Sequence, residues 1–216
     1  MNSQTQISLV VFDLGRVLVR ICDNWEHACK VAGLEHRPEK LSAEREAALY
    51  EAVYAAEVGA LDTREFAREA GRHMQMAEDD VIAVSSAYLR GTYPGAVELL
   101  DDLAAVGMKT ACLSNTNANH WRLLTDRSDA NYFPLDKLTH QFASHLVRMR
   151  KPEDRIYAHL EAQTGTAAQR IIFFDDLADN IGAARQRGWN TCHIRTDADP
   201  IAQERAVLRE LGILSS

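Results

Sequence analysis

The chain has few cysteines and no long apolar run. Its 216 residues hold four cysteines, which lie far apart and form no Cys-x-x-Cys pair. This usage argues against a disulfide framework or a cysteine-based zinc site, so we expect buried free thiols. The longest apolar stretches are strand-sized and show no secretory pattern. They indicate neither a membrane span nor a signal peptide, and we therefore expect a cytoplasmic protein.

Positive charge is also scarce. The 24 Lys and Arg residues are outnumbered by 31 Asp and Glu residues, which gives a formal net charge of −7. No basic cluster or stripe appears, and this balance repels nucleic-acid phosphates. The eight histidines show no His-x-x-x-His or His/Cys metal spacing. We expect neither a nucleic-acid nor a membrane partner, and the sequence leaves the oligomeric state open.

Alternating strand and helix patterns in the second half predict a parallel sheet. Strand-like runs lie at 109–113, 141–144, 171–174 and 191–194, with helical segments between them. This alternation is typical of a sheet covered by helices on both faces. With a further apolar run from Ile7 to Phe12, it predicts the α/β fold class and a three-layer, Rossmann-like core.

The first half is different, because residues 22–91 show amphipathic helical segments and no convincing strand. Asp62 and Glu65 form an acidic capping box, and Gly71 predicts the end of that helix. We interpret 22–91 as a helical cap inserted into a core of residues 1–21 and 92–216. Such a cap would cover the carboxyl ends of the strands and close over a ligand.

Aromatic residues within this cap leave two readings open. Trp25, Tyr54 and Tyr88 either form a wall that contacts a substrate or belong to the apolar core of the cap. Aromatic side chains at helical spacing are more often core.

One carboxylate ends the first predicted strand. Asp13 directly follows the apolar run, and Gly15 stands two residues later. Ligands of open α/β sheets bind beyond the carboxyl ends of the strands, so Asp13 is placed where chemistry usually occurs. A second acid would be expected two residues after Asp13, at position 15, and none is present.

Three later polar clusters are expected at the same edge of the sheet. They are Ser114–Asn117, Arg150–Glu153 and Asp175–Asn180. Carboxylates brought together there cannot all stay ionised without compensation. A hard divalent cation supplies it, and Mg²⁺ prefers oxygen ligands and substrate phosphates. Lys151 would then pair with the remaining negative charge of the ligand.

Four motifs in this order carry a family resemblance. They are Phe12-Asp13-Leu14-Gly15, Leu113-Ser114-Asn115-Thr116-Asn117, Arg150-Lys151-Pro152-Glu153, and Phe173-Phe174-Asp175-Asp176 with Asp179-Asn180. The chain resembles the haloacid dehalogenase-like hydrolase superfamily over nearly its whole length. Within it, the chain is similar to the α-glucose-1-phosphate phosphatases, which also read Asp-Leu-Gly and Ser-Asn-Thr-Asn.

The resemblance implies a Mg²⁺-dependent phosphatase for a small phosphorylated metabolite, in this subgroup a sugar phosphate. Asp13 would form an aspartyl-phosphate. The implied metal ligands are Asp13, the Gly15 carbonyl and Asp176, with Asp175 acting directly or through water. The implied phosphoryl-binding groups are Ser114, the Asn115 backbone and Lys151. Asp13, Ser114 and Lys151 make up the implied catalytic set.

Gly15 departs from many phosphatases of the family, which carry a second aspartate there. That acid protonates the leaving alcohol, and such help contributes about 10²–10⁴-fold. Two alternatives therefore stay open. A 2-haloacid dehalogenase would use the same aspartate on carbon without a metal, although the Asp175–Asp176 pair speaks against it. The other is a catalytically weak protein that binds a phosphorylated ligand.

Overall fold

A central parallel sheet organises the protein. The computed structural model describes residues 6–34 and 42–215. Its five-stranded sheet has the order β5-β4-β1-β6-β7, and all neighbouring strands pair in parallel. The strands are β1 (Leu9–Phe12), β4 (Lys109–Ser114), β5 (His140–Ala143), β6 (Ile171–Asp175) and β7 (Asn190–His193). The structure confirms the predicted parallel α/β sheet, and it places β1 at the centre.

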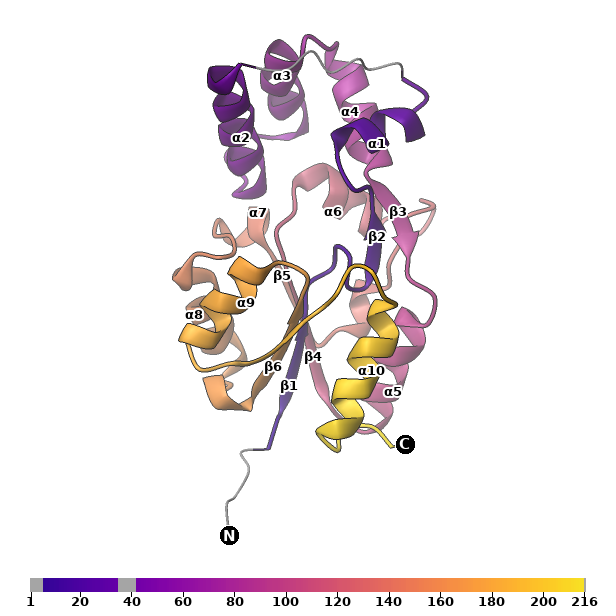
Figure 1. Ribbon diagram of the computed structural model, residues 1–216, viewed down its shortest axis with the longest axis vertical. Helices are drawn as coiled ribbons and strands as arrows, with labels where there is room; N and C mark the ends of the chain where they lie inside the picture. Colours follow the sequence, from indigo (N-terminus) through magenta and orange to yellow (C-terminus); the bar gives the residue numbers. More distant parts are fainter. Residues whose placement is uncertain (1–5, 35–41, 216) are drawn as a thin grey trace.

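Helices cover both faces of this sheet (Figure 1). On one side lie α5 (Ala96–Ala105) and α10 (Pro200–Glu210), and on the other lie α8 (Asp154–Thr164) and α9 (Ala178–Gln186). Alternate residues of β1 pack toward the two helical layers, because successive strand side chains point to opposite faces of the sheet. Val10 and Phe12 join one apolar cluster, whereas Leu9 and Val11 join the other. This confirms the three-layer core.

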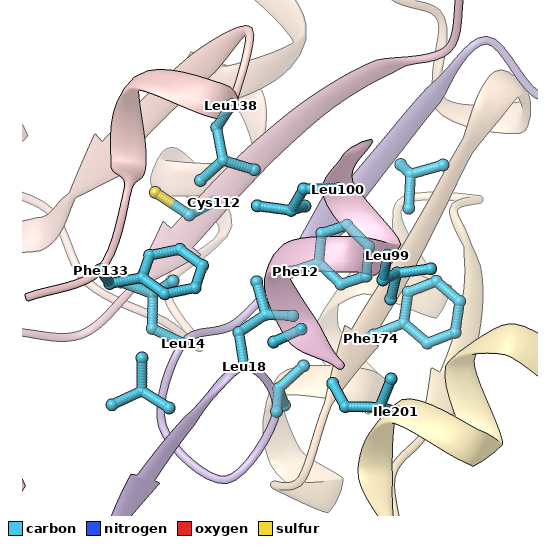
Figure 2. Packing of buried hydrophobic residues seen from close by; sticks show 14 of the residues in the cluster. Phe12, Leu14, Leu18, Leu99, Leu100, Cys112, Phe133, Leu138, Phe174 and Ile201 are labelled. Carbon is cyan, nitrogen blue, oxygen red and sulfur yellow. The ribbon is translucent and has the colours of Figure 1, made fainter. Parts of the chain in front are cut away.

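The packing around Phe12 shows how the core holds the end of β1. Its ring stacks on Phe174 with 5.4 Å between centroids. Leu99 and Leu100 of α5 and Ile201 of α10 close the same cluster (Figure 2). Burial of such side chains from water stabilises the fold, and close packing leaves the strand little freedom to shift.

A second group of helices lies beyond the carboxyl ends of the strands (Figure 1). It comprises α1 (Trp25–Val31), α2 (Ala43–Glu57), α3 (Thr63–Met74) and α4 (Glu78–Ala87). The antiparallel strands β2 (Val19–Ile21) and β3 (Leu89–Thr92) connect this group to the sheet. All four helices fall within the predicted cap of 22–91, of which 35–41 lie outside the described residues. The exact cap and core boundaries stay a prediction.

Two expectations for the cap were wrong. The first is the absence of a strand, because β3 begins at Leu89 within it. Only one of its four residues is buried, so pairing with β2 defines this strand and no sequence pattern marks it. The second is the end of α3, which continues past Gly71 to Met74. A Cβ at position 71 would lie 2.6 Å from the Met76 carbonyl oxygen, so this glycine permits close packing.

The remaining α-helices of the described residues follow strands of the core. They are α6 (Ala118–Thr125) after β4 and the short α7 (Ser144–Val147) after β5. The capping box at Asp62 and Glu65 is confirmed, and all four cysteines are free. Among the described residues, no helix has the length and apolar character needed to cross a bilayer.

Glu204 of α10 is buried without compensation. Neither carboxylate oxygen has a hydrogen-bond partner among the described residues. Burial, with a smaller contribution from Asp199, raises the pKa of Glu204 well above its ordinary value of 4.5. The folded protein therefore favours the protonated acid at this position.

We expect the substitution Glu204→Gln to stabilise the protein more at about pH 8 than at about pH 5. Between the ordinary and the raised pKa, the folded protein keeps a proton that the unfolded chain releases, so stability falls as pH rises. The neutral amide removes this loss, which is at most about 1.4 kcal/mol per pH unit. Urea unfolding at both pH values measures the difference. A difference from wild type that stays constant with pH would contradict the account.

Candidate active site

Three carboxylates meet at the carboxyl edge of the sheet. Asp13 follows β1, whereas Asp175 is the last residue of β6 and Asp176 comes next. Phe12 pairs in register with Phe174, so the residues after them lie side by side. One oxygen from each of the three carboxylates lies within 4.8 Å of the others. The structure thus brings together three of the acids that the sequence placed at this edge, whereas the fourth, Asp179, is exposed and lies outside the group.

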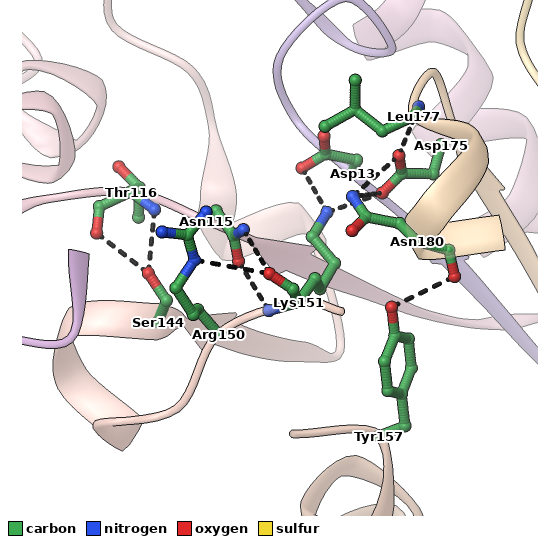
Figure 3. Close-up of polar contacts among 10 residues, drawn as sticks. All are labelled: Asp13, Asn115, Thr116, Ser144, Arg150, Lys151, Tyr157, Asp175, Leu177 and Asn180. Atoms are coloured by element: carbon green, nitrogen blue, oxygen red, sulfur yellow. Dashed lines mark hydrogen bonds and ion pairs between the residues drawn. The ribbon is translucent and has the colours of Figure 1, made fainter. Parts of the chain in front are cut away.

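Lys151 lies between two of these acids (Figure 3). Its Nζ is 2.9 Å from Asp13 Oδ1 and 2.7 Å from Asp175 Oδ2, and its side chain is only 1% exposed. Burial alone would lower the pKa of Lys151, but the two carboxylates outweigh burial and raise it. The lysine is therefore held as a cation inside the protein.

The backbone of Lys151 is fixed by the motif that follows β4. Asn115 Nδ2 donates to the Lys151 carbonyl oxygen, and the Lys151 amide donates to Asn115 Oδ1, both at 2.9 Å. The Asn115 side chain is therefore engaged in positioning the lysine. Its backbone remains the group predicted to bind a phosphoryl oxygen.

Asp175 is fully buried and has both oxygens occupied. Besides Lys151, it accepts hydrogen bonds from the Leu177 amide at 2.8 Å and from Asn180 Nδ2 at 3.1 and 3.0 Å. It does not line the cavity above the sheet, whereas Asp13 and Asp176 do. This environment suits Asp175 to orienting Lys151, and it leaves Asp176 as the more open carboxylate.

Burial and the neighbouring charges raise the pKa values of the two carboxylates that face the cavity. Burial raises the pKa of Asp13 to about 7; Lys151 opposes the shift, and Asp175 and Asp176 add to it. Burial, then the Asp175 charge, also raises the pKa of Asp176. A bound divalent cation would relieve this repulsion. The cavity offers it hard oxygen donors from Asp13, Asp176 and the backbone at Gly15, so the residues present fit Mg²⁺.

Ser114 is the last residue of β4 and also lines the cavity. The loop after it is clamped, because the Thr116 amide donates to Ser144 Oγ at 2.9 Å and that hydroxyl donates to the Thr116 carbonyl at 3.0 Å. Asn117 then caps α6 by accepting from the His120 amide. Ser114 is thus presented from a fixed loop beside a helix N-terminus, which suits an anion.

Arg16 is a cavity residue that sequence reasoning missed. It adopts a left-handed backbone conformation with φ of 59°, and its amide donates to the Val19 carbonyl at 2.8 Å. The guanidinium approaches Asp176 Oδ2 at 3.6 Å and Asp23 Oδ1 at 3.8 Å. Arginine rarely takes this conformation, so no local pattern indicates that the turn directs it toward the acids.

Gly15 leaves no side-chain acid beside Asp13. A Cβ there would lie 3.2 Å from Ile21 Cδ1. Two titratable groups elsewhere in the cavity wall are already engaged. The Nε2 of His120 lies 2.8 Å from the Ser85 carbonyl oxygen. Glu57 Oε2 lies 3.0 Å from Arg150 Nη1, at ion-pair distance, and neither atom has a hydrogen-bond partner among the described residues. Burial lowers the pKa of His120 and raises that of Glu57, which favours the neutral form of each.

The fold and the site together define an α/β enzyme in which the Asp13 carboxylate, a buried lysine and an acidic pair meet at one edge of a parallel sheet. A sequence model of the haloacid dehalogenase-like hydrolase family matches residues 7–188. The chain therefore belongs to this family, and its four motifs occur in the order that the resemblance required.

Known proteins of two kinds are similar to this chain. Enolase-phosphatase E1 of Serratia proteamaculans is 32% identical over 131 residues, which cover 57% of this chain and 56% of the relative. A phosphatase of Mycobacterium tuberculosis is 26% identical over 157 residues, or 70% of this chain and 69% of the relative. The chain thus spans little more than half of the first relative's length.

A solved structure confirms the fold. A HAD family enzyme from Bacteroides thetaiotaomicron has a TM-score of 0.75 at 20% identity, with 90% of this chain and 96% of that chain covered. The same enzyme in complex with magnesium and inorganic phosphate gives a TM-score of 0.72 at 22% identity, with 89% and 96% covered.

We expect Mg²⁺ to raise the thermal unfolding midpoint, and Asp176→Asn to abolish the rise. A ligand that binds only the folded state stabilises it, and the substitution removes an anionic oxygen facing the cavity. Asp179→Asn is the matched control, because Asp179 is exposed on the adjoining helix. Thermal scans with Mg²⁺ or chelator measure the shift. Equal shifts in both variants would contradict the proposed ligand set.

Proposed function

We propose that this protein is a Mg²⁺-dependent phosphatase that hydrolyses a small phosphorylated metabolite through an aspartyl-phosphate on Asp13. The observation that carries the proposal is the placement of Asp13. Its carboxylate lines the cavity, is held by buried Lys151 and lies beside Asp176. Relatives named as phosphatases, and a fold relative solved with magnesium and phosphate, support the same chemistry.

The site residues have separate roles in the two steps of phosphoryl transfer. A carboxylate oxygen of Asp13 attacks phosphorus, the bond from phosphorus to the ester oxygen breaks, and the alkoxide leaves and takes a proton from solvent. Lys151, the Ser114 hydroxyl and the Asn115 backbone bind the phosphoryl oxygens and hold them in line. Water then attacks phosphorus, and the bond between phosphorus and the Asp13 oxygen breaks. Phosphate leaves, the proton of the attacking water goes to solvent or to the phosphate, and the Asp13 carboxylate is regenerated.

Asp13, Asp176 and the Gly15 carbonyl would hold Mg²⁺, with Asp175 acting directly or through water. The cation supplies charge neutralisation for the phosphoryl oxygens. Asp175, which is itself held by Asn180, fixes Lys151, whose charge is needed at the same place. Both cationic groups are required because the attacking group and the substrate are anionic.

The finer assignment to a sugar phosphate rests on the resemblance to glucose-1-phosphate phosphatases. A sugar 1-phosphate suits a site without an acid at Gly15, because its anomeric oxygen leaves more readily than a simple alkoxide. The cytoplasmic location and the restriction to small-molecule partners stay predictions. The dehalogenase alternative leaves Asp176 without a role beside Asp13, so the acidic pair favours the phosphatase.

We expect Asp13→Asn to reduce the rate of Mg²⁺-dependent phosphate release from para-nitrophenyl phosphate about a thousandfold or more. The amide is a poor nucleophile and cannot form the phosphorylated intermediate. Asp179→Asn should retain the wild-type rate because its side chain is exposed. Colorimetric assays with Mg²⁺ or excess chelator measure both variants.

Three results would overturn the proposal. An undiminished rate in Asp13→Asn would remove Asp13 as nucleophile. Chloride release from chloroacetate in excess chelator, without phosphatase activity, would establish the dehalogenase. Mg²⁺-dependent binding of phosphate esters without turnover of any would establish the binding protein.

A further inference from the structure

The cavity above Asp13 has walls of different chemistry. It measures about 550 Å³ and lies between the sheet edge and the cap helices. Its floor carries Asp13, Ser114, Lys151 and Asp176, the groups assigned to the phosphoryl transfer. The opposite wall, which we call the roof, is formed by Trp25, Leu49, Val53, Phe66, Met74 and Tyr88.

The roof is part of the folded interior of the cap. Leu49, Phe66 and Met74 pack in one apolar cluster, Tyr88 packs in another, and Trp25 contacts both. Trp25, Leu49, Val53, Phe66 and Tyr88 are partly buried and Met74 is buried. These side chains are therefore held in place from behind while they line the cavity.

Some of the polar groups near the roof already contact one another. The Glu57 carboxylate pairs with Arg150 at 3.0 Å. The Ser85 hydroxyl lies 3.2 Å from His120 Nε2. Arg150 also lies over the ring of Tyr54, 5.3 Å from its centroid. A ligand under the roof thus meets mainly apolar surface. Three buried polar atoms of the cavity wall have no hydrogen-bond partner among the described residues, namely Trp25 Nε1, Glu57 Oε2 and Arg150 Nη1.

We infer that the substrate is a phosphate monoester of an apolar alcohol, in particular an aryl alcohol, in place of the polyhydroxylated sugar that the resemblance to glucose-1-phosphate phosphatases implies. This inference rests on the proposed phosphatase function and concerns the part of the substrate that leaves. Each sugar hydroxyl without a partner under the roof weakens binding about fivefold or more. Each buried methylene strengthens it about threefold to fourfold.

The missing acid points in the same direction. Gly15 cannot protonate a leaving alkoxide, whereas a phenolate leaves without a proton. The rings of Trp25, Phe66 and Tyr88 offer flat apolar surface to an aromatic group. An aryl phosphate therefore meets both requirements, the low basicity of the leaving oxygen and the apolar surroundings.

A series of 4-alkylphenyl phosphates tests the inference, with kcat/KM measured for phenyl, methylphenyl, propylphenyl and butylphenyl esters. The leaving oxygens of the alkylated members have nearly the same acidity, so the slope reports contact with the roof. We expect kcat/KM to rise about threefold per methylene until the cavity is full. All should exceed glucose 1-phosphate and glucose 6-phosphate by about tenfold or more.

A pair of variants on α2 locates the effect. Val53→Asn places an amide in the roof and should flatten the chain-length slope, whereas Tyr50→Asn should leave it unchanged because Tyr50 is 59% exposed. The ratio of kcat/KM for the butylphenyl ester to kcat/KM for the phenyl ester is compared between the variants and the wild type, because losses common to both esters cancel in it. Val53→Thr, which is nearly isosteric, should lower the ratio and guards against misfolding of the asparagine variant.

The outcomes separate this inference from the proposed function. Acetyl phosphate, whose acyl group is too small to fill the cavity, reports phosphoryl transfer itself. If it is hydrolysed while the slope is flat, or if the glucose phosphates are preferred, the apolar substrate is overturned and the phosphatase stands. If acetyl phosphate and every ester resist hydrolysis with Mg²⁺, the proposed function fails and this inference fails with it.

Discussion

The buried ion triad of Lys151 with Asp13 and Asp175 is the interaction on which the site depends. An ammonium group with 1% exposure is tolerable only because two carboxylates lie within 2.9 Å of its Nζ. Removing the lysine would leave two buried carboxylates facing each other and Asp176. Two asparagines hold the triad in place. Asn115 fixes the lysine backbone, and Asn180 fixes Asp175.

The sheet supplies the precision that this triad needs. Register between β1 and β6 sets the spacing of Asp13 and Asp175, and the stacked rings of Phe12 and Phe174 lie directly beneath. The cap contributes differently, because it shapes the space above the acids. In the proposed reaction, the glycine at position 15 supplies no proton, so the alcohol would leave unaided, and the roof would offer it apolar surface.

Much of the fold and the polar site follows from the sequence, because carboxyl ends of neighbouring parallel strands share one edge. That rule places Asp13, Ser114 and the Asp175–Asp176 pair together without knowledge of side-chain positions. The left-handed turn at Arg16 and the strand β3 depend on tertiary contacts. The roof could not be predicted from the sequence either, because helical periodicity does not show whether an apolar helix face packs in a core or lines a cavity. Trp25 and Tyr88 pack in the cap core and also line the cavity, whereas the Tyr54 hydroxyl donates to Glu153.

Chemical trapping of the intermediate tests the central claim most directly. Borohydride reduces an acyl phosphate to an alcohol but leaves a carboxylate unchanged. Quenching the enzyme with borohydride during turnover of para-nitrophenyl phosphate should therefore convert Asp13 to homoserine, detected by mass spectrometry of the peptide that contains it. The conversion should require both substrate and Mg²⁺. Phosphate release with Asp13 unmodified, or with the label on another residue, would contradict the account.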